Sequence, residues 1–511
     1  MDGSFHAFIS CPSFFGQYLS ALARAYAITG SRPTQQKVQR ILQQFAPTVR
    51  SAFYDNYHLP AYTYDKTSCG LIDAYRLAGN HTALAVCAAA TEAVVPHLPE
   101  KALAREEQFA RPHKDEAYCW DETYTLPENL FLAYRLSGNP RYRALATRFI
   151  EDDSYFDPLA RGENVLLGEH AYSHVNVLSS AMQAYLVLGN KKHLRAARND
   201  FDFVCVQSLA TGGWGPNESF RRPGSGEVGQ SLRRTHASFE TPCGAYGHFK
   251  IGRYLLTTTG DSRYGDSMES ILYNTILGTK PLKEDGTSFY YSDYNMQATK
   301  VYHHDKWPCC SETFPQITAD YGISSYFHDK DGIYVNLYVP SCLKWQQNGA
   351  HLALTQRTAY PHAAHTEFEL TADRDTSFAL RLRIPAWAGA KTTLSINGKH
   401  IPADLTPGRF ATVARSWRNN DRIALELDIP LTLQAVDAEH PDQVALQRGS
   451  LALFAVKLPE QPITRAELLQ AHPLSTDSLD WEAVTSAGRM SFKPFQAITD
   501  EQYRLYQEVK A

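Results

Sequence analysis

The chain has 511 residues, a net charge of −4, and 43% hydrophobic and 20% charged residues, which is an ordinary globular composition. The length exceeds what one hydrophobic core usually supports, so we expect more than one domain. The charge gives no reason to expect nucleic acid or an anionic membrane as a partner, and no apolar run predicts a transmembrane helix. The first residues lack a signal-peptide pattern, which predicts a cytoplasmic protein unless a leader precedes this start.

The first half of the chain repeats one short signal. Its variants are AYAITG (25–30), AYRLAGN (74–80), AYRLSGN (133–139), AYLVLGN (184–190) and RYLLTTTGD (253–261). Each variant ends an apolar helical stretch at a glycine, which readily takes the left-handed conformation at a helix C-terminus. The spacing of these glycines leaves room for one helical hairpin per repeat. The sequence therefore predicts an (α/α)6-barrel-like toroid over residues 1–325, and a non-repeating helical bundle is the alternative.

The second half changes to strand periodicity. In FALRLRIPAW (378–387) and RIALELDIPL (422–431), apolar residues alternate with polar or small ones. The segment LSINGKH (394–400) is typical of a hairpin with an Asn-Gly turn. Short alternating strands separated by turns predict an antiparallel β-sandwich over residues 326–511.

The chain has nine cysteines, and their spacing indicates no disulfide framework. Cys309 and Cys310 are adjacent in DKWPCCSETFPQ (305–316), and Glu240 and Cys243 lie three apart in THASFETPCG (235–244). One carboxylate and three thiols can hold Zn²⁺ in tetrahedral geometry. The spacing does not distinguish such a site from buried thiols without a metal.

Two further stretches carry candidate site residues. In ATGGWGPNESF (210–220), Glu218 follows a glycine-rich turn that lets the backbone approach a ligand, so Glu218 is a candidate general acid. An exposed loop glutamate is the alternative. In GEHAYSHVN (168–176), His170 and His174 share a face if the segment is helical, so they could bind metal or sugar hydroxyls. Two core histidines are the alternative.

Together these stretches resemble the β-L-arabinofuranosidases of glycoside hydrolase family 127 and their relatives. The resemblance implies an (α/α)6 barrel followed by β-sandwich structure. The likeness of GGWGPNESF implies that Glu218 is the acid/base, and HAYSHVN implies that His170 and His174 contact substrate. The resemblance further implies zinc held by Glu240, Cys243, Cys309 and Cys310, Cys309 as the nucleophile, and His236 and Glu122 as additional candidate substrate contacts.

The chain departs from the family pattern at two places. Cys243 follows Glu240 by three residues with Pro242 inserted, where the family commonly has two, so we expect a reshaped ligand loop. Asp65 stands where the family often has a histidine, so we expect a different substrate pocket.

The resemblance implies a retaining glycoside hydrolase that releases a furanose, β-L-arabinofuranose first, through a thioglycosyl intermediate. It would act on an oligosaccharide or glycoconjugate. A homodimer is a possible oligomeric state. One alternative is a polysaccharide lyase with Tyr290, Tyr291 or Tyr294 as its base. The other is a carbohydrate-binding protein with structural zinc, because structural zinc sites are closed by four protein ligands.

Overall fold

A computed structural model of the chain describes residues 12–57, 59–103, 107, 121–214, 218–234, 239–285, 287, 289, 292–300, 302, 308–457, 463–475 and 478–510. Within these ranges, only the backbone is described at residues 12–13, 239–240 and 308–312. No helix in the described ranges combines the length and apolar character needed to cross a bilayer.

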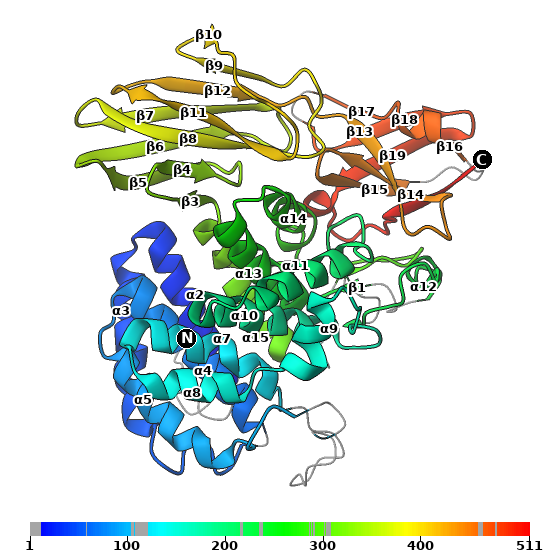
Figure 1. The fold of residues 1–511 in the computed structure, drawn as a ribbon. Coiled ribbons are helices and arrows are strands. Elements are labelled where there is room, and N and C mark those ends of the chain that lie inside the picture. The colour runs from blue at the N-terminus through cyan, green and yellow to red at the C-terminus, as the bar shows by residue number, and fades with distance from the viewer. Residues whose placement is uncertain are drawn as a thin grey trace.

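Six helices among the described residues form a closed ring. They are α2 (Pro12–Thr29), α4 (Pro60–Ala78), α7 (Leu126–Ser137), α10 (Ala171–Leu188), α13 (Pro242–Thr259) and α15 (Pro308–Ile323). Each of these inner helices packs against the next, and α15 packs back against α2. Figure 1 shows this helical part in the lower half of the molecule. The ring confirms the predicted (α/α)6 toroid.

An outer helix follows each of the first five inner helices. The outer helices are α3 (Arg32–Phe45), α5 (Ala83–Val94), α8 (Pro140–Arg148), α11 (Lys191–Cys205) and α14 (Arg263–Ile271), and shorter helices are α9 (Asp157–Ala160), α12 (Glu227–Ser231) and α16 (Arg465–Leu468). The predicted helix-ending glycines 30, 79, 138, 189 and 260 all have positive φ, between 63° and 74°. These glycines therefore turn the chain from each inner helix into its outer partner, as the sequence predicts.

The two ends of the ring differ because every inner helix runs in the same direction. Short glycine turns connect inner to outer helices at one end. At the other end, the longer segments 46–59, 95–125, 149–170, 206–241 and 272–307 lead back to the next inner helix. Proline opens α2, α4, α13 and α15 and is the second residue of α7. Proline suits a first helical turn because its missing N–H has no intrahelical partner there anyway.

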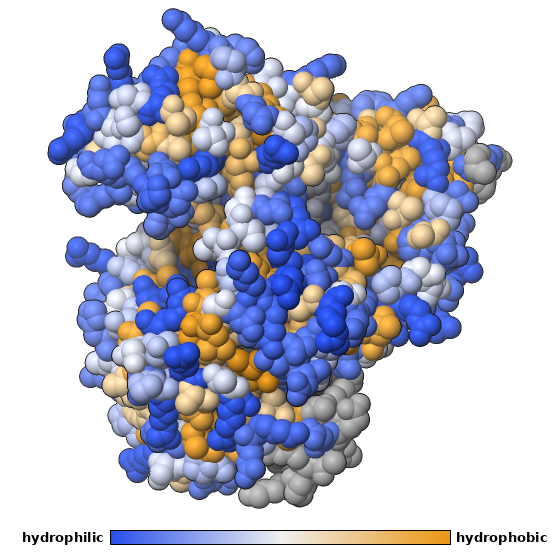
Figure 2. Space-filling model, viewed as in Figure 1, coloured by the Kyte–Doolittle hydropathy of each residue, from blue (hydrophilic) through white to orange (hydrophobic). Residues whose placement is uncertain are grey.

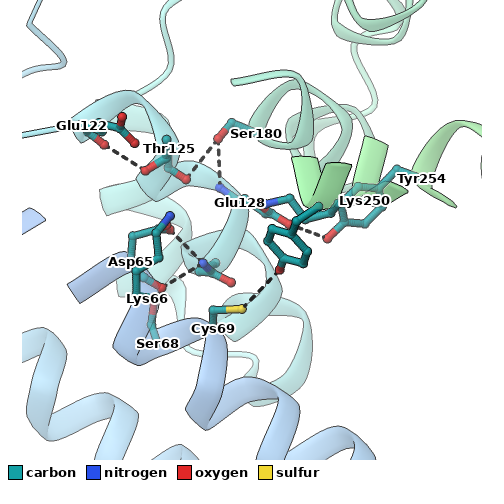
Figure 3. Close-up of polar contacts among 12 residues, drawn as sticks. Asp65, Lys66, Ser68, Cys69, Glu122, Thr125, Glu128, Ser180, Lys250 and Tyr254 are labelled. Carbon is teal, nitrogen blue, oxygen red and sulfur yellow. Dashed lines mark hydrogen bonds and ion pairs between the residues drawn. The ribbon is translucent and has the colours of Figure 1, made fainter. Parts of the chain in front are cut away.

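Polar side chains fill the middle of the ring (Figure 3). Lys250 of α13 forms an ion pair with Glu128 of α7, and Tyr254 donates to the same carboxylate at 2.9 Å. Asn129 donates to the Asp65 carboxylate at 2.8 Å, which ties α7 to α4. These contacts join α4, α7 and α13 across the ring interior.

The first β unit is a two-sheet sandwich. One sheet has the order β10 (Lys399–His400), β9 (Thr393–Ile396), β12 (Arg422–Glu426), β7 (His365–Ala372), β6 (Ala350–Thr358) and β5 (Ser341–Gln347). The other has the order β11 (Arg409–Trp417), β8 (Thr376–Ile384), β4 (Gly332–Val335) and β3 (Tyr326–His328). Trp345 and Phe378 meet between the sheets with ring centroids 5.5 Å apart. The sandwich confirms the predicted alternation, although β4 and β8 pair in parallel because the chain between them crosses to the other sheet.

A second β unit follows, which the sequence did not separate from the first. Its strands are β13 (Leu431–Ala435), β14 (Gln443–Arg448), β15 (Leu451–Lys457), β16 (Ile463–Thr464), β17 (His472–Pro473), β18 (Trp481–Thr485), β19 (Gly488–Pro494) and β20 (Tyr506–Lys510). They form one sheet, seen in orange and red at the upper right of Figure 1. A two-stranded pair, β1 (Phe239–Glu240) and β2 (Ser292–Asp293), belongs to the helical half.

The sandwich lies over the glycine-turn end of the ring. A cleft of about 940 Å³ lies between them, lined by Ile28 of α2, Tyr321 of α15 and Tyr326 of β3. Figure 2 shows the hollow on the left of the molecule, with apolar residues at its base. Helices give way to strands between Ile323 and Tyr326. The domain boundary placed at residue 325 stays a prediction.

Candidate active site

The candidate site lies at the other end of the ring, where the inner helices begin. Here the segments before α10 and α13 pair with each other over a short stretch. The Gly168 amide donates to the Phe220 carbonyl at 2.9 Å, and the Phe220 amide donates to the Glu169 carbonyl at 3.0 Å. His170 and Ser219, next along the two segments, form an isolated antiparallel bridge. This pairing places the two predicted site segments side by side.

Glu218 and His170 face each other as a result. The distance from His170 Nε2 to Glu218 Oε2 is 3.9 Å, and both side chains are partly exposed, at 29% and 22%. Glu218 has φ +53°, a left-handed conformation that is uncommon for a residue other than glycine. Such backbone strain persists only where surrounding structure imposes it, and it is concentrated at functional sites.

His170 also begins helix α10. As the N-cap residue, its Nδ1 lies 3.4 Å from the Ser173 amide and 3.1 Å from Ser173 Oγ. Ser173 Oγ donates in turn to Glu122 Oε1. The N-cap thus fixes the imidazole ring at the helix start and leaves Nε2 toward Glu218.

Glu122 is a buried carboxyl, 6% exposed, just before α7. Burial raises the pKa of Glu122 above its ordinary value, although Lys66, Ser173 and His170 favour the ionised form. Its Oε2 atom has no hydrogen-bond partner among the described residues. Lys66 of α4 is also buried, and its Nζ lies 3.0 Å from Asp65 Oδ2. Asp65, at the departure from the family pattern, is therefore held in an internal ion pair.

His174 lies deeper than His170. Its side chain is 2% exposed, its Nδ1 donates to the His170 carbonyl at 2.9 Å, and Tyr155 Oη lies 2.6 Å from its Nε2. Glu169 Oε2 lies 3.5 Å from the same nitrogen. The two histidines share one helix start but differ in access, since only His170 is appreciably exposed.

Cys243 stands in the first turn of α13. Thr241 caps this helix by accepting from the Gly244 amide at 3.2 Å, and Pro242 is its first residue, so the extra residue in the motif opens the helix. The buried Cys243 Sγ lies 3.0 Å from Thr313 Oγ1 of α15. Thr313 is one turn beyond Cys309 and Cys310, so the first turns of α13 and α15 lie against each other.

The two helices begin alike, with Pro242-Cys243 in α13 and Pro308-Cys309 in α15. A helix N-terminus carries partial positive charge and unpaired N–H groups, both of which favour a thiolate over a thiol. This arrangement suits cysteines that act as metal ligands or as a nucleophile.

A pocket lies between these groups. It is lined by Glu218 and Trp214 from one loop, Tyr172 of α10, and Thr241 and Gly244 at the start of α13. The candidate acid and the cysteine-bearing helix start therefore border the same space.

Several predicted residues lie outside the described side chains. His236 falls in residues 235–238, and only the backbone of Glu240, Cys309 and Cys310 is described. The Glu240 backbone pairs with Ser292 directly before α13. Among the side chains that are described, no three His, Cys, Asp or Glu groups gather as metal ligands. The four-ligand zinc set stays a prediction, as do the substrate contacts assigned to His170, His174, His236 and Glu122.

Of the tyrosines considered for a lyase, Tyr290 and Tyr291 lie outside the described residues. Tyr294 is 1% exposed and packs near Phe454 and Phe495, with ring centroids 6.1 Å and 6.3 Å away. This surrounding is that of a core residue.

Sequence reasoning missed Ser173, Tyr172 and Thr313. Ser173 and Thr313 each lie three residues after a predicted site residue, His170 and Cys310, so helical spacing was the signal that could have found them. Tyr172 carries no comparable signal, because tyrosine is common in this chain.

Domains of one known family match most of the chain. The match to the β-L-arabinofuranosidase GH127 catalytic domain covers residues 9–323, and that to the GH127 middle domain covers residues 332–429. A non-reducing end β-L-arabinofuranosidase of Bifidobacterium longum subsp. longum is 24% identical over 258 residues, which are 45% of this chain and 38% of that protein. The matched part thus spans well under half of that relative's length.

Solved structures share the fold. The GH127 β-L-arabinofuranosidase Ara127N-Se of Geobacillus stearothermophilus T6 superposes with a TM-score of 0.74 at 19% identity, covering 98% of this chain and 90% of that one. Another GH127 β-arabinofuranosidase gives 0.72 at 16% identity, covering 97% and 87%. Because the catalytic-domain match covers more than half of the sequence, the chain belongs to the GH127 β-L-arabinofuranosidase family, a family of glycoside hydrolases.

Proposed function

We propose that this protein is a glycoside hydrolase that releases β-L-arabinofuranose from an oligosaccharide or glycoconjugate. Family membership supports the reaction class. The observation that carries the proposal is the shared pocket: Glu218 borders it from one side, and the first turn of α13, with Cys243, borders it from another. Cys309 and Cys310 stand within one helical turn of the contact between Cys243 and Thr313.

The reaction proceeds with retention of anomeric configuration, in two displacements. The Cys309 thiolate attacks the anomeric carbon while the bond from that carbon to the leaving oxygen breaks, and Glu218 gives its proton to that oxygen. Glu218 then takes a proton from water, whose oxygen attacks the same carbon and releases the Cys309 thiolate. His170, beside Glu218, contacts the sugar.

Zn²⁺ is the proposed cofactor, with Glu240, Cys243, Cys309 and Cys310 as its ligands. The burial of Cys243, its contact with α15 and the two cysteine-bearing helix starts support this donor set. Bound zinc would keep these cysteines deprotonated near neutral pH, where a free thiol is mostly protonated.

Two measurements test the mechanism. NMR of the first product from an aryl β-L-arabinofuranoside should show the β configuration retained. Mass spectrometry after treatment with a haloacetamide-bearing arabinofuranoside should find the label on Cys309. An inverted product, or a label on Glu240 with Cys309 unmodified, would overturn the cysteine mechanism. Absence of hydrolysis across a panel of aryl arabinofuranosides would overturn the choice of sugar.

A further inference from the structure

A continuous polar chain joins a buried carboxyl to the candidate acid/base. Glu122 Oε1 accepts from Ser173 Oγ, which lies 3.1 Å from His170 Nδ1, and His170 Nε2 lies 3.9 Å from Glu218 Oε2. The two inner members are buried, with Ser173 1% and Glu122 6% exposed, whereas His170 and Glu218 are partly exposed. The inner part of the chain is thus shielded from solvent.

The serine hydroxyl limits the arrangements that this chain can take. A hydroxyl has one proton to donate and can accept through its lone pairs. When Glu122 is ionised, the Ser173 proton is committed to Glu122, so Ser173 Oγ can only accept from an N–H at His170 Nδ1. Neutral His170 then carries its proton on Nδ1 and presents a lone pair at Nε2.

The opposite arrangement follows when Glu122 is neutral. Protonated Glu122 can donate to Ser173 Oγ, and the Ser173 hydroxyl can donate to an unprotonated His170 Nδ1. The Ser173 amide, 3.4 Å from Nδ1, suits this arrangement as well because it also donates to that nitrogen. His170 then carries its proton on Nε2, facing Glu218.

Building on the proposed function, we propose that Glu122 and Ser173 are positioning residues that set which ring nitrogen of His170 carries the proton, and so whether His170 presents a donor or an acceptor to Glu218 and the bound sugar. At 3.9 Å the effect on Glu218 is electrostatic, because the distance exceeds a hydrogen bond. An Nε2–H favours ionised Glu218, the form that acts as base in the second step, and an Nε2 lone pair favours protonated Glu218.

The charged groups around Glu122 influence whether its carboxyl is protonated. Lys66 and Asp65 face it from α4, and His170 faces it from the start of α10. Burial raises the pKa of Glu122, which brings its proton exchange closer to neutral pH than that of an ordinary glutamate.

Three variants and a matched control test the inference. Ser173→Ala breaks the chain, Ser173→Thr keeps a hydroxyl, and Glu122→Gln removes the charge. Ser180→Ala is the control, because Ser180 is also buried on α10 but accepts from the Glu128 amide at 3.3 Å and donates to the Thr125 carbonyl at 3.2 Å (Figure 3).

The first readout is the pH profile of kcat on an arabinofuranoside with a poor leaving group. We expect Ser173→Ala and Glu122→Gln to lower kcat about ten-fold and to shift the profile, as fits the loss of a hydrogen bond to a charged group. Ser173→Thr should restore the wild-type profile and Ser180→Ala should keep it. If Ser173→Ala keeps the wild-type profile, the inference is wrong.

The second readout does not depend on activity. ¹⁵N NMR of protein with labelled histidine reports the tautomer of His170, identified by the signals that His170→Gln removes. We expect the Nδ1–H form to grow in wild type as pH rises and Glu122 ionises, and the Nε2–H form to dominate in Ser173→Ala at every pH at which His170 is neutral. If a protein that hydrolyses no arabinofuranoside gave this result, the link from Glu122 through Ser173 to His170 would be upheld and the proposed function would be rejected. An identical tautomer in wild type and Ser173→Ala would show that Ser173 does not link Glu122 to His170, and the inference would be wrong.

Discussion

The two ends of the helical ring are built from the same six helices but are chemically opposite. At the glycine-turn end, Arg24 pairs with Asp73 at 2.9 Å and with Asp320, and Arg253 reaches Asp320 at 2.6 Å. Every member of this cluster has a partner. At the other end lie the Glu122 carboxyl, whose Oε2 has no partner among the residues that the structure describes, the strained Glu218 and the cysteine-bearing helix starts.

Helix polarity explains much of the difference. Arg24 and Arg253, in the last two turns of α2 and α13, lie toward the negative ends of the helix dipoles, whereas Cys243 lies at the positive end of α13. Although burial opposes its charge, Arg24 lowers the pKa of Asp73 below its ordinary value. The glycine-turn end therefore stabilises the fold through paired charges. The end where the inner helices begin holds polar groups that can still bind a ligand.

We expect substitution of a cysteine ligand to have the largest effect of the changes considered. We expect about one zinc per chain by elemental analysis, and we expect Cys310→Ser to lose the zinc, nearly all activity and thermal stability, because metal binding contributes folding free energy. Cys342→Ser is the control, since Cys342 is exposed on β5 and should change none of these. A metal-free preparation with full activity would contradict the proposed site.

Glu218→Gln should give the next largest effect. General acid catalysis typically contributes about 10²–10⁴-fold, so hydrolysis of natural glycosides should slow by that factor with folding unchanged. An aryl glycoside with a good leaving group should lose less in the first step, because it needs little protonation. Glu227→Gln, which removes a glutamate 48% exposed nearby on α12, is the control. Wild-type rates for Glu218→Gln on natural glycosides would remove Glu218 from the mechanism.

At the glycine-turn end, stability should change instead of activity. Asp320 is fully buried and pairs with both Arg24 and Arg253, so Asp320→Ala leaves buried arginines short of a partner. We expect a loss of about 3–5 kcal/mol in the free energy of unfolding, with activity per folded molecule retained. Glu92→Ala, which breaks an exposed pair with Arg141, should cost about 0–1 kcal/mol. Denaturant titration measures the free energy of unfolding of both variants. Equal losses for Asp320→Ala and Glu92→Ala would contradict a stabilising role for the buried cluster.

The smallest effect concerns the turns themselves. Gly189 has φ +74° and open space where a Cβ atom would lie. Gly189→Ala should therefore lower the free energy of unfolding by about 1 kcal/mol, the cost of the left-handed conformation alone. Gly189→Asn should lose less, because asparagine tolerates the left-handed region. Thermal unfolding of both variants checks the order, and an asparagine variant less stable than the alanine one would reverse it.

The features of local origin could be read from the sequence. The glycine at each helix end needs only its own backbone conformation, and the alternation in FALRLRIPAW needs only one buried face, so both predictions were confirmed. The pairing of residues 168–170 with 218–220 joins segments about fifty residues apart and has no local signature. The chain from Glu122 to Ser173 likewise depends on how the segment before α7 meets the start of α10.

The second β unit shows the same limit. Strands β14 and β15 are buried along most of their length and lack the alternation of the sandwich strands, and only long-range pairing assigns them to a separate sheet. The zinc ligands were predicted through family resemblance, since vicinal cysteines have no diagnostic spacing of their own.

The unequal connections have a consequence for how such a protein can diversify. The glycine turns, as short as two residues at Gly138-Asn139 and Gly189-Asn190, fix the architecture and leave no room for insertion. The longer segments lie at the opposite end, and 206–241 lines the pocket through Gly213, Trp214 and Glu218. Such segments tolerate changes in length far better, because loop closure costs little entropy per added residue. Substrate range can therefore evolve, or be engineered, by exchanging one set of loops while the helical frame is inherited intact.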